Sequence, residues 1–282
     1  MLRIGPSGNS LSFYESGHKH TYEAAEWLAS IGLTAYEYSF GRGVHITDET
    51  AEKIRKEMNK FGVELSVHAP YYTNFANPDP EMIKKSVGYI LSSLIAMRKM
   101  GGRRTVFHPA TLGKMKREEA VALAKGNIVY LMETLQNELS FDDYILCPET
   151  MGKLGQIGTV EEVVEFCKLD SHLYPCYDFG HINSYTRGGI QTKDDYRRII
   201  DYTFQELGEL KAKNIHIHFS KIQYGPSGEI RHLTFADTQY GPLYEPLAEI
   251  IDEYRMTPFI ICESKEVMAE DALIMKNCHK NV

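Results

Sequence analysis

The sequence predicts an α/β fold, a single (β/α)8 TIM barrel that spans residues 1–282. Three observations support this prediction. Short apolar runs rich in β-branched and aromatic residues alternate with longer stretches of helical periodicity. This alternation is strict and repeats eight times, which indicates parallel strands joined by helical crossovers. The length of 282 residues also fits one such barrel, which usually has about 250 residues.

Each expected strand is a short apolar run, and each expected helix follows one of them. The strands are expected at residues 2–5, 35–38, 63–67, 104–107, 144–148, 173–177, 214–219 and 258–262. The helices are expected at residues 21–31, 48–61, 80–100, 117–135, 160–168, 193–207 and 244–254, with Thr21 as the first N-cap. A closed barrel is favoured over an open nucleotide-binding sheet because the glycines after the first strand lack the GxGxxG spacing. Residues 221–241 are rich in Gly, Pro and aromatic residues and are expected to form a loop over the active face.

Composition restricts the class of protein. The formal net charge of -7 gives no overall attraction to nucleic acid, although a local cationic patch remains possible. The five cysteines are an odd number without CxxC spacing, which predicts free thiols in a reducing compartment. No apolar run approaches the roughly 18 residues that cross a bilayer, and the N-terminus lacks the pattern of a signal peptide. A cytoplasmic protein without a membrane partner is expected.

Histidines and carboxylates fall at the C-terminal ends of six consecutive expected strands. They are His68, His108, Glu149, Asp178 with His181, His216 with His218, and Glu263. In a parallel barrel these strand ends converge on one rim, where barrel enzymes build their active sites. One isolated residue of this kind is more often a hydrogen-bonding group than a ligand. Six successive strands that repeat the pattern predict a shared metal site.

The types of residue indicate which ions fit. Imidazole and carboxylate together suit Zn²⁺, with Mn²⁺ or Fe²⁺ as alternatives, and two or three ions are expected. Glu149 is central in the series and could bridge two ions roughly 3.5 to 4 Å apart. His216 and His218 are two residues apart and face the same side, so alternation alone leaves both as candidates. In the following loop, Glu229 and His232 could complete a further ion site.

These motifs together resemble the endonuclease IV family of apurinic/apyrimidinic DNA endonucleases, within the xylose-isomerase-like barrels. The matching stretches are His-Ala-Pro-Tyr at 68–71, Phe-His-Pro at 107–109, Glu-Thr-Met-Gly-Lys at 149–153, Asp-Phe-Gly-His at 178–181 and Glu-Ser at 263–264. Members of this family bind three zinc ions. The resemblance implies one ion on His68 and His108, a second on Glu149, Asp178, a strand-seven histidine and Glu263, and a third on His181 and His232.

The chain departs from the family pattern at two places that affect the expected ligands. The family motif His-Leu-Asn-Asp-Ser-Lys compares with His-Ile-His-Phe-Ser-Lys at 216–221, which favours His216 over His218 as the strand-seven ligand. The family sequence Asp-Arg-His compares with Ile-Arg-His at 230–232. The third ion therefore lacks its carboxylate unless Glu229 replaces it.

The leading functional hypothesis is a metal-dependent hydrolase that cleaves damaged DNA at abasic sites, with Glu149 as the catalytic residue that orients the attacking water. The candidates for substrate binding are Tyr71, His218, Lys221 and Arg231. The alternative is a metal-dependent sugar isomerase or epimerase. That reaction needs only one or two ions, on Glu149, Asp178, His216 and Glu263, with Lys221 near a sugar hydroxyl or phosphate. The acidic net charge favours this alternative.

Overall fold

Eight parallel strands close into a barrel in the computed structural model, which describes residues 2–279. The strands are β1 (Arg3–Pro6), β2 (Ala35–Ser39), β3 (Glu64–His68), β4 (Arg104–Phe107), β6 (Ile145–Pro148), β8 (Cys176–Asp178), β9 (His216–Phe219) and β12 (Phe259–Cys262). They form two four-stranded sheets, β2-β3-β4-β6 and β1-β12-β9-β8. Isolated parallel bridges Ser7–Glu37 and Glu149–Cys176 join the two sheets at both seams. The predicted (β/α)8 barrel is confirmed.

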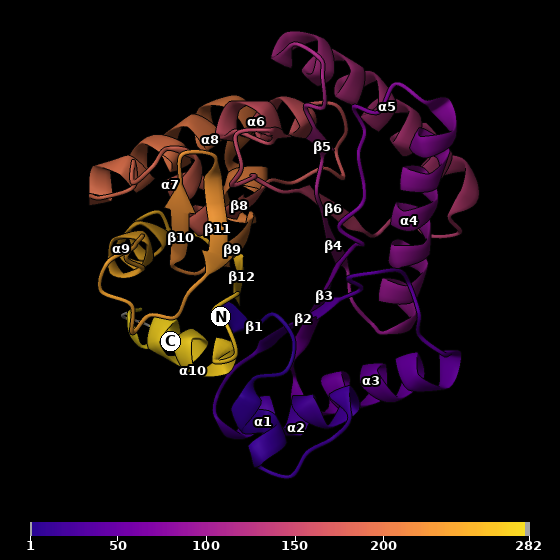
Figure 1. Ribbon diagram of the computed structural model, residues 1–282. Helices are drawn as coiled ribbons and strands as arrows, with labels where there is room; N and C mark the ends of the chain where they lie inside the picture. Colours follow the sequence, from indigo (N-terminus) through magenta and orange to yellow (C-terminus); the bar gives the residue numbers. More distant parts are fainter. Residues whose placement is uncertain (1, 280–282) are drawn as a thin grey trace.

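Helices surround the strands (Figure 1). The longer ones are α2 (Ala24–Ser30), α3 (Asp48–Phe61), α4 (Pro80–Lys99), α5 (Arg117–Glu138), α6 (Val160–Cys167), α8 (Lys193–Lys213), α9 (Glu245–Glu253) and α10 (Met268–Asn277). The shorter ones are α1 (Leu11–Glu15), the 3-10 turn η1 (Thr21–Glu23) and α7 (Phe179–Tyr185). Thr21 begins η1, which His20 caps, so the prediction that Thr21 caps the first long helix is wrong. Among the described residues, no helix is long and apolar enough to cross a membrane.

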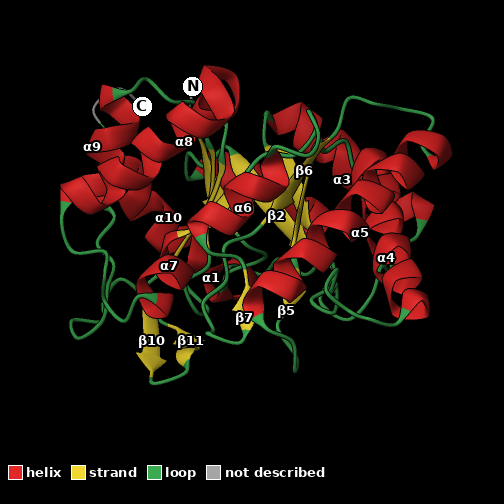
Figure 2. Ribbon diagram, turned by 90° about the horizontal axis from the view of Figure 1, so that it is seen from above, coloured by secondary structure: helices red, strands yellow, loops and turns green. Residues whose placement is uncertain are grey.

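The segment expected to be a loop contains an antiparallel hairpin, β10 (Ile222–Gly225) and β11 (Gly228–His232). A second short antiparallel pair joins β5 (Ala110–Thr111) to β7 (Gln156–Ile157). Both pairs project from the same end of the barrel in Figure 2. They follow the C-terminal ends of β9, β4 and β6, so they lie around the rim to which the candidate ligands point.

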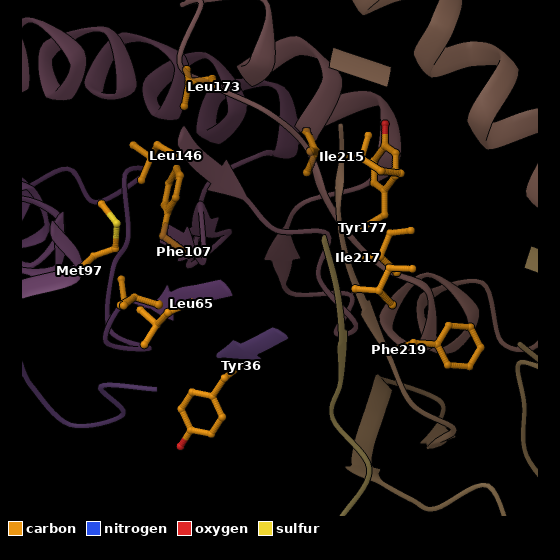
Figure 3. Packing of buried hydrophobic residues seen from close by; sticks show 14 of the residues in the cluster. Tyr36, Leu65, Met97, Phe107, Leu146, Leu173, Tyr177, Ile215, Ile217 and Phe219 are labelled. Atoms are coloured by element: carbon orange, nitrogen blue, oxygen red, sulfur yellow. The ribbon is translucent and has the colours of Figure 1, made fainter. Parts of the chain in front are cut away.

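The alternation of side chains along each strand separates the core into two parts. Outward-facing residues such as Phe107, Ile215 and Ile217 are fully buried among the helices (Figure 3). Burial of each such side chain stabilises the fold by roughly 1.5–3 kcal/mol. The barrel interior holds smaller apolar clusters, one of Val106, Cys147 and Cys176 and one of Ala35, Phe259 and Ile261. All five cysteines are free, as the sequence predicts.

Candidate metal centre

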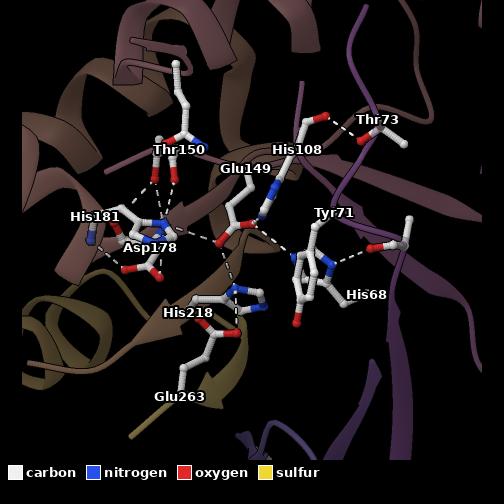
Figure 4. Close-up of polar contacts among 12 residues, drawn as sticks. His68, Tyr71, Thr73, His108, Glu149, Thr150, Asp178, His181, His218 and Glu263 are labelled. Carbon is white, nitrogen blue, oxygen red and sulfur yellow. Dashed lines mark hydrogen bonds and ion pairs between the residues drawn. The ribbon is translucent and has the colours of Figure 1, made fainter. Parts of the chain in front are cut away.

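The histidines and carboxylates at the strand ends meet around Glu149 (Figure 4). Three groups of potential ligand atoms lie at this rim, and within each group the atoms are within 4.8 Å of one another. They are His68, His108 and Glu149; then Glu149, Asp178, His218 and Glu263; then His181, Glu229 and His232. We call these the first, second and third ligand groups. Glu149 belongs to two of them.

The first ligand group joins the ends of β3, β4 and β6. Nε2 of His68 lies 3.1 Å and Nε2 of His108 lies 3.3 Å from the same oxygen, Oε2 of Glu149. Nδ1 of His68 lies 2.7 Å from the carbonyl oxygen of Ala69, to which it can donate a hydrogen bond. This arrangement leaves the Nε2 lone pair of His68 directed at the group, as in metal-bound histidines whose other nitrogen is held by a carbonyl.

The second ligand group contains His218 in the place for which the sequence favours His216. Nδ1 of His218 lies 3.0 Å from Oε1 of Glu149 and 3.6 Å from Oε1 of Glu263. The strand register explains the difference, because His218 pairs with Asp178 at the rim whereas His216 pairs with Cys176 one layer deeper. The geometry at the rim therefore favours His218 over His216 as the strand-seven member of this group.

A fourth set of donor atoms, on Cys176, His216 and His218, lies below the rim at similar spacing. Burial raises the pKa of the Cys176 thiol well above its usual range despite the nearby His218. A thiol binds metal as the thiolate, and the raised pKa of Cys176 disfavours the thiolate in the metal-free protein. The three groups at the rim, each with a carboxylate, are better suited to cations.

Asp178 is fixed by the start of α7. Its Oδ1 accepts a hydrogen bond of 2.7 Å from the backbone N–H of His181, as an N-cap does. Its Oδ2 is buried, forms no hydrogen bond with any described group, and lies 3.3 Å from Nδ1 of His181. A buried carboxylate oxygen without a hydrogen bond is costly, so this atom fits a cation ligand.

The third ligand group combines α7 with the hairpin. Nε2 of His181 lies 3.4 Å from Oε2 of Glu229, and Nε2 of His232 lies 4.0 Å from Oε1 of the same carboxylate. Nδ1 of His181 lies 3.0 Å from the carbonyl oxygen of Thr150, and Nδ1 of His232 lies 2.8 Å from Oγ of Ser220. The structure thus places Glu229 where the sequence comparison leaves a carboxylate missing.

The charges of the site compensate one another only in part. Burial raises the pKa of Glu149, but the neighbouring imidazoles, first among them His218, outweigh burial and hold this pKa well below its usual range. Burial lowers the pKa of His181, but Asp178 and Glu149 outweigh it and raise the pKa to about 10. Burial and the charges of Glu149 and Asp178 raise the pKa of Glu263 despite His218. Clustered carboxylates therefore depend on positive charge, which protons or divalent cations can supply.

The residues predicted to bind substrate lie in different surroundings. The ring of Tyr71 is half exposed, and its centroid lies 5.2 Å from that of His68 and 5.4 Å from that of His108, at the edge of the first ligand group. Lys221 is buried, and its Nζ donates 2.9 Å to the carbonyl oxygen of Phe235 as well as to that of Asp237. Lys221 therefore holds the chain after the hairpin through its ammonium group.

Two further residues complete the comparison with the sequence predictions. Arg231 is exposed on the hairpin, where its Nε donates 2.8 Å to Oε1 of Gln223. Glu37 is absent from the predicted set, yet it is fully buried inside the barrel and lies 2.9 Å from Nε2 of His218. Its only signal in the sequence is a carboxylate in the middle of the apolar run at 35–38, where alternation gives it the inward face.

Known proteins resemble this chain in sequence. The profile described as "Xylose isomerase-like TIM barrel" matches residues 25–278. An uncharacterized protein of Methanocaldococcus jannaschii is 28% identical over 284 residues, covering 100% of this chain and 98% of that protein. A probable endonuclease 4 of Acholeplasma laidlawii is 28% identical over 243 residues, covering 78% of each chain.

Solved structures agree with the barrel. Endonuclease IV from Thermus thermophilus has a TM-score of 0.67 at 19% identity and covers 92% of this chain and 93% of its own. A D-tagatose 3-epimerase-like protein has a TM-score of 0.65 at 20% identity and covers 89% of each chain. At these identities the structures show a common fold. Together with the profile match over residues 25–278, this shows that the chain belongs to the xylose isomerase-like TIM barrel family.

Proposed function

We propose that the protein is a divalent-metal-dependent phosphodiester hydrolase that cleaves DNA at abasic sites. The observation that carries the proposal is the presence of three adjoining ligand groups, because hydrolysis of a phosphodiester uses several cations around one phosphate. The relative from Acholeplasma laidlawii, a probable endonuclease 4, supports the same reaction. Three ligand groups exceed the one or two ions that a sugar isomerase needs.

The donor atoms suit zinc, with manganese or iron as alternatives. All three ligand groups combine imidazole nitrogen with carboxylate oxygen, and Oδ2 of Asp178, which is buried without a hydrogen bond, supports a cation in the second group. The ions would be held by His68, His108, Glu149, Asp178, His218, Glu263, His181, Glu229 and His232. Bound divalent ions activate water and neutralise the charge on phosphate oxygens.

Glu149 has the position of a catalytic residue. Its Oε2 faces His68 and His108, whereas its Oε1 faces His218, so one carboxylate spans the first and second ligand groups. It would hold the attacking water beside the phosphorus of a substrate bound at the rim. The half-exposed ring of Tyr71 at the edge of the site would contact the substrate where an abasic nucleotide leaves the helical stack.

A sugar isomerase or epimerase is the second candidate. The second ligand group by itself forms a complete site for one ion, with three carboxylates and one imidazole. The net charge of -7 and the structural similarity to a D-tagatose 3-epimerase-like protein favour this candidate. An isomerase or epimerase would not need the third ligand group for its reaction. Removal of that group should therefore affect a hydrolase but not an epimerase.

The test uses the zinc-loaded protein and measures metal content together with two reactions. We expect three ions per chain and nicking of a duplex that carries a single abasic site. We also expect Glu229→Gln to lose one ion and to reduce nicking. A protein that binds fewer ions, leaves the duplex intact and exchanges the carbon-bound proton of a ketose in deuterated water would overturn the hydrolase and establish the epimerase.

A further inference from the structure

A buried carboxylate lies inside the barrel beneath the metal centre. Glu37 is the third residue of β2, is 0% exposed, and does not belong to any of the three ligand groups. Burial of a charged carboxylate is expensive unless specific partners compensate it. Its partners therefore indicate what it does.

The two oxygens of Glu37 have different neighbours. Oε1 lies 2.9 Å from Nε2 of His218. Both atoms are buried and neither forms a hydrogen bond with any described residue, so their contact is a close approach of opposite charges without the geometry of a hydrogen bond. Oε2 lies 3.2 Å from Nε2 of His216 and accepts a hydrogen bond of 2.8 Å from Oγ of Ser66. One oxygen thus faces the ligand histidine, and the other is held from below.

His216 supports this arrangement rather than the ligand groups around Glu149. Its ring stacks on Phe259, with centroids 5.2 Å apart and an interplanar angle of 20°, and it is fully buried. Its Nε2 faces Glu37. His216, which the sequence favours as a metal ligand, therefore packs beside Glu37, the carboxylate that contacts His218.

His218 lies between two sets of carboxylates. Its Nδ1 faces Glu149 and Glu263, and its Nε2 faces Glu37. A metal-bound histidine usually donates its second ring N–H to a carboxylate or carbonyl, which fixes the tautomer and the orientation of the ring. Here Glu37 occupies the place of that acceptor.

We propose that Glu37 is a positioning residue that holds His218 with its proton on Nε2, so that Nδ1 is presented to a divalent cation in the second ligand group. Ser66 holds Glu37 in turn through its hydrogen bond, and His216 packs beside the same oxygen. This inference rests on the metal binding in the proposed function and goes beyond it by assigning a role to residues outside the ligand groups.

The experiment compares Glu37→Gln with the wild-type protein in zinc affinity and in the tautomer of His218. Gln keeps the shape of the side chain and removes its charge. Zinc affinity, measured by competition with a chromophoric chelator, should fall about 10- to 100-fold for one ion. Long-range ¹H–¹⁵N spectra of the zinc-loaded protein should show His218 with its proton on Nε2 in the wild type. In Glu37→Gln the same spectra should show a mixture of His218 tautomers, or a tautomer that differs from that of the wild type.

Asp252→Asn is a matched control, because it replaces a carboxylate beside a different buried histidine, His279. Nδ1 of His279 lies 2.8 Å from Oδ1 of Asp252, and His279 is not in a ligand group. This variant should leave zinc affinity and the His218 signals unchanged. Ser66→Ala, which removes one donor to Glu37, should weaken zinc binding several-fold and provides the measurement if Glu37→Gln does not fold.

The outcomes separate this inference from the proposed function. Unchanged zinc affinity and an unchanged His218 tautomer in Glu37→Gln overturn the inference, even if the wild type nicks abasic DNA. Weakened zinc binding in Glu37→Gln supports it even if the wild-type protein does not cleave DNA, and in that case only the proposed reaction fails.

Discussion

Glu149 connects the first and second ligand groups through its two oxygens. Oε2 lies 3.1 Å from His68 and 3.3 Å from His108, and Oε1 lies 3.0 Å from His218. The carboxylate is 1% exposed, so its interactions are mainly with these neighbours. The loss of its charge should disturb both groups at once.

Glu149→Gln should therefore reduce activity by more than about 100-fold, because the carboxylate shared by the first and second ligand groups loses its charge. Turnover is measured under saturating zinc for either candidate reaction, with metal content determined on the same sample. Glu266→Gln is the control, because that carboxylate is exposed and outside the ligand groups. Full turnover in Glu149→Gln would remove Glu149 from the mechanism.

Among the secondary-structure elements, the hairpin depends on a close approach between two backbones. Gly228 has φ +94 and forms an antiparallel bridge with Lys153. A Cβ at this position would lie 2.2 Å from the carbonyl oxygen of Gly152. Only glycine fits here without displacement, and the adjacent Glu229 and the nearby His232 depend on the position of this strand.

Gly228→Ala should move the hairpin away from Gly152 and lower the occupancy of the third ligand group. Metal analysis should show loss of about one ion per chain while the other two ligand groups stay occupied. Gly155→Ala is the control, because no atom lies within 4 Å of the corresponding Cβ. An unchanged metal content in Gly228→Ala would contradict the dependence of the third group on the hairpin.

The start of α8 gives a prediction about pH. Burial raises the pKa of Asp195, but hydrogen bonds from the backbone of Gln191 and Thr192, from the Thr192 hydroxyl and from Arg198 outweigh it and lower the pKa from 3.8 to about 2. A carboxyl with a lowered pKa in the folded state stabilises the protein above the unfolded value. This contribution is present above pH 3.8 and is lost as the pH falls toward 2.

Asp195→Asn should lower the free energy of unfolding by about 1 kcal/mol at pH 7. The difference from the wild type should shrink between about pH 4 and pH 3, as measured by urea unfolding. Asp194→Asn is the control, because the Asp194 side chain is 87% exposed and lies 3.8 Å from its nearest cation, Arg197. The role of Asp195 would be contradicted if both substitutions lowered the free energy of unfolding equally. It would also be contradicted if the difference between Asp195→Asn and the wild type did not vary with pH.

Across the complete barrel, the metal centre links strands from both halves. His68, His108 and Glu149 come from one four-stranded sheet, and Asp178 and His218 come from the other. Cations bound among them would connect the two sheets across the interior. Metal binding should therefore contribute to the stability of the folded barrel.

Removal of metal with EDTA should lower the Tm by more than about 5 °C relative to the zinc-loaded protein. The expected cause is loss of cations that bind only the folded state. Scanning calorimetry or circular dichroism measures the change, and Glu149→Gln should respond much less to the chelator. Identical Tm values with and without zinc would show that the ligand groups do not bind this ion in solution.

The order of residues along the chain was sufficient to predict the barrel and most of the residues at its rim. Strand and helix periods depend on local alternation, so the eight strands could be located without coordinates. His68, His108, Asp178 and Glu263 lie at or directly after the ends of those strands, and the parallel topology requires the strand ends to converge. The structure brings all four into the ligand groups.

Only the tertiary structure shows which side chains lie in the same layer of the barrel. The register between β8 and β9 places His218 beside Asp178 and leaves His216 one layer deeper, where it meets Glu37 from the distant strand β2. The hairpin similarly supplies Glu229 to His181 through a contact that its own sequence does not specify. Alternation reveals the face of a residue, but its height and its partner across the barrel depend on strand stagger, which is set by long-range pairing.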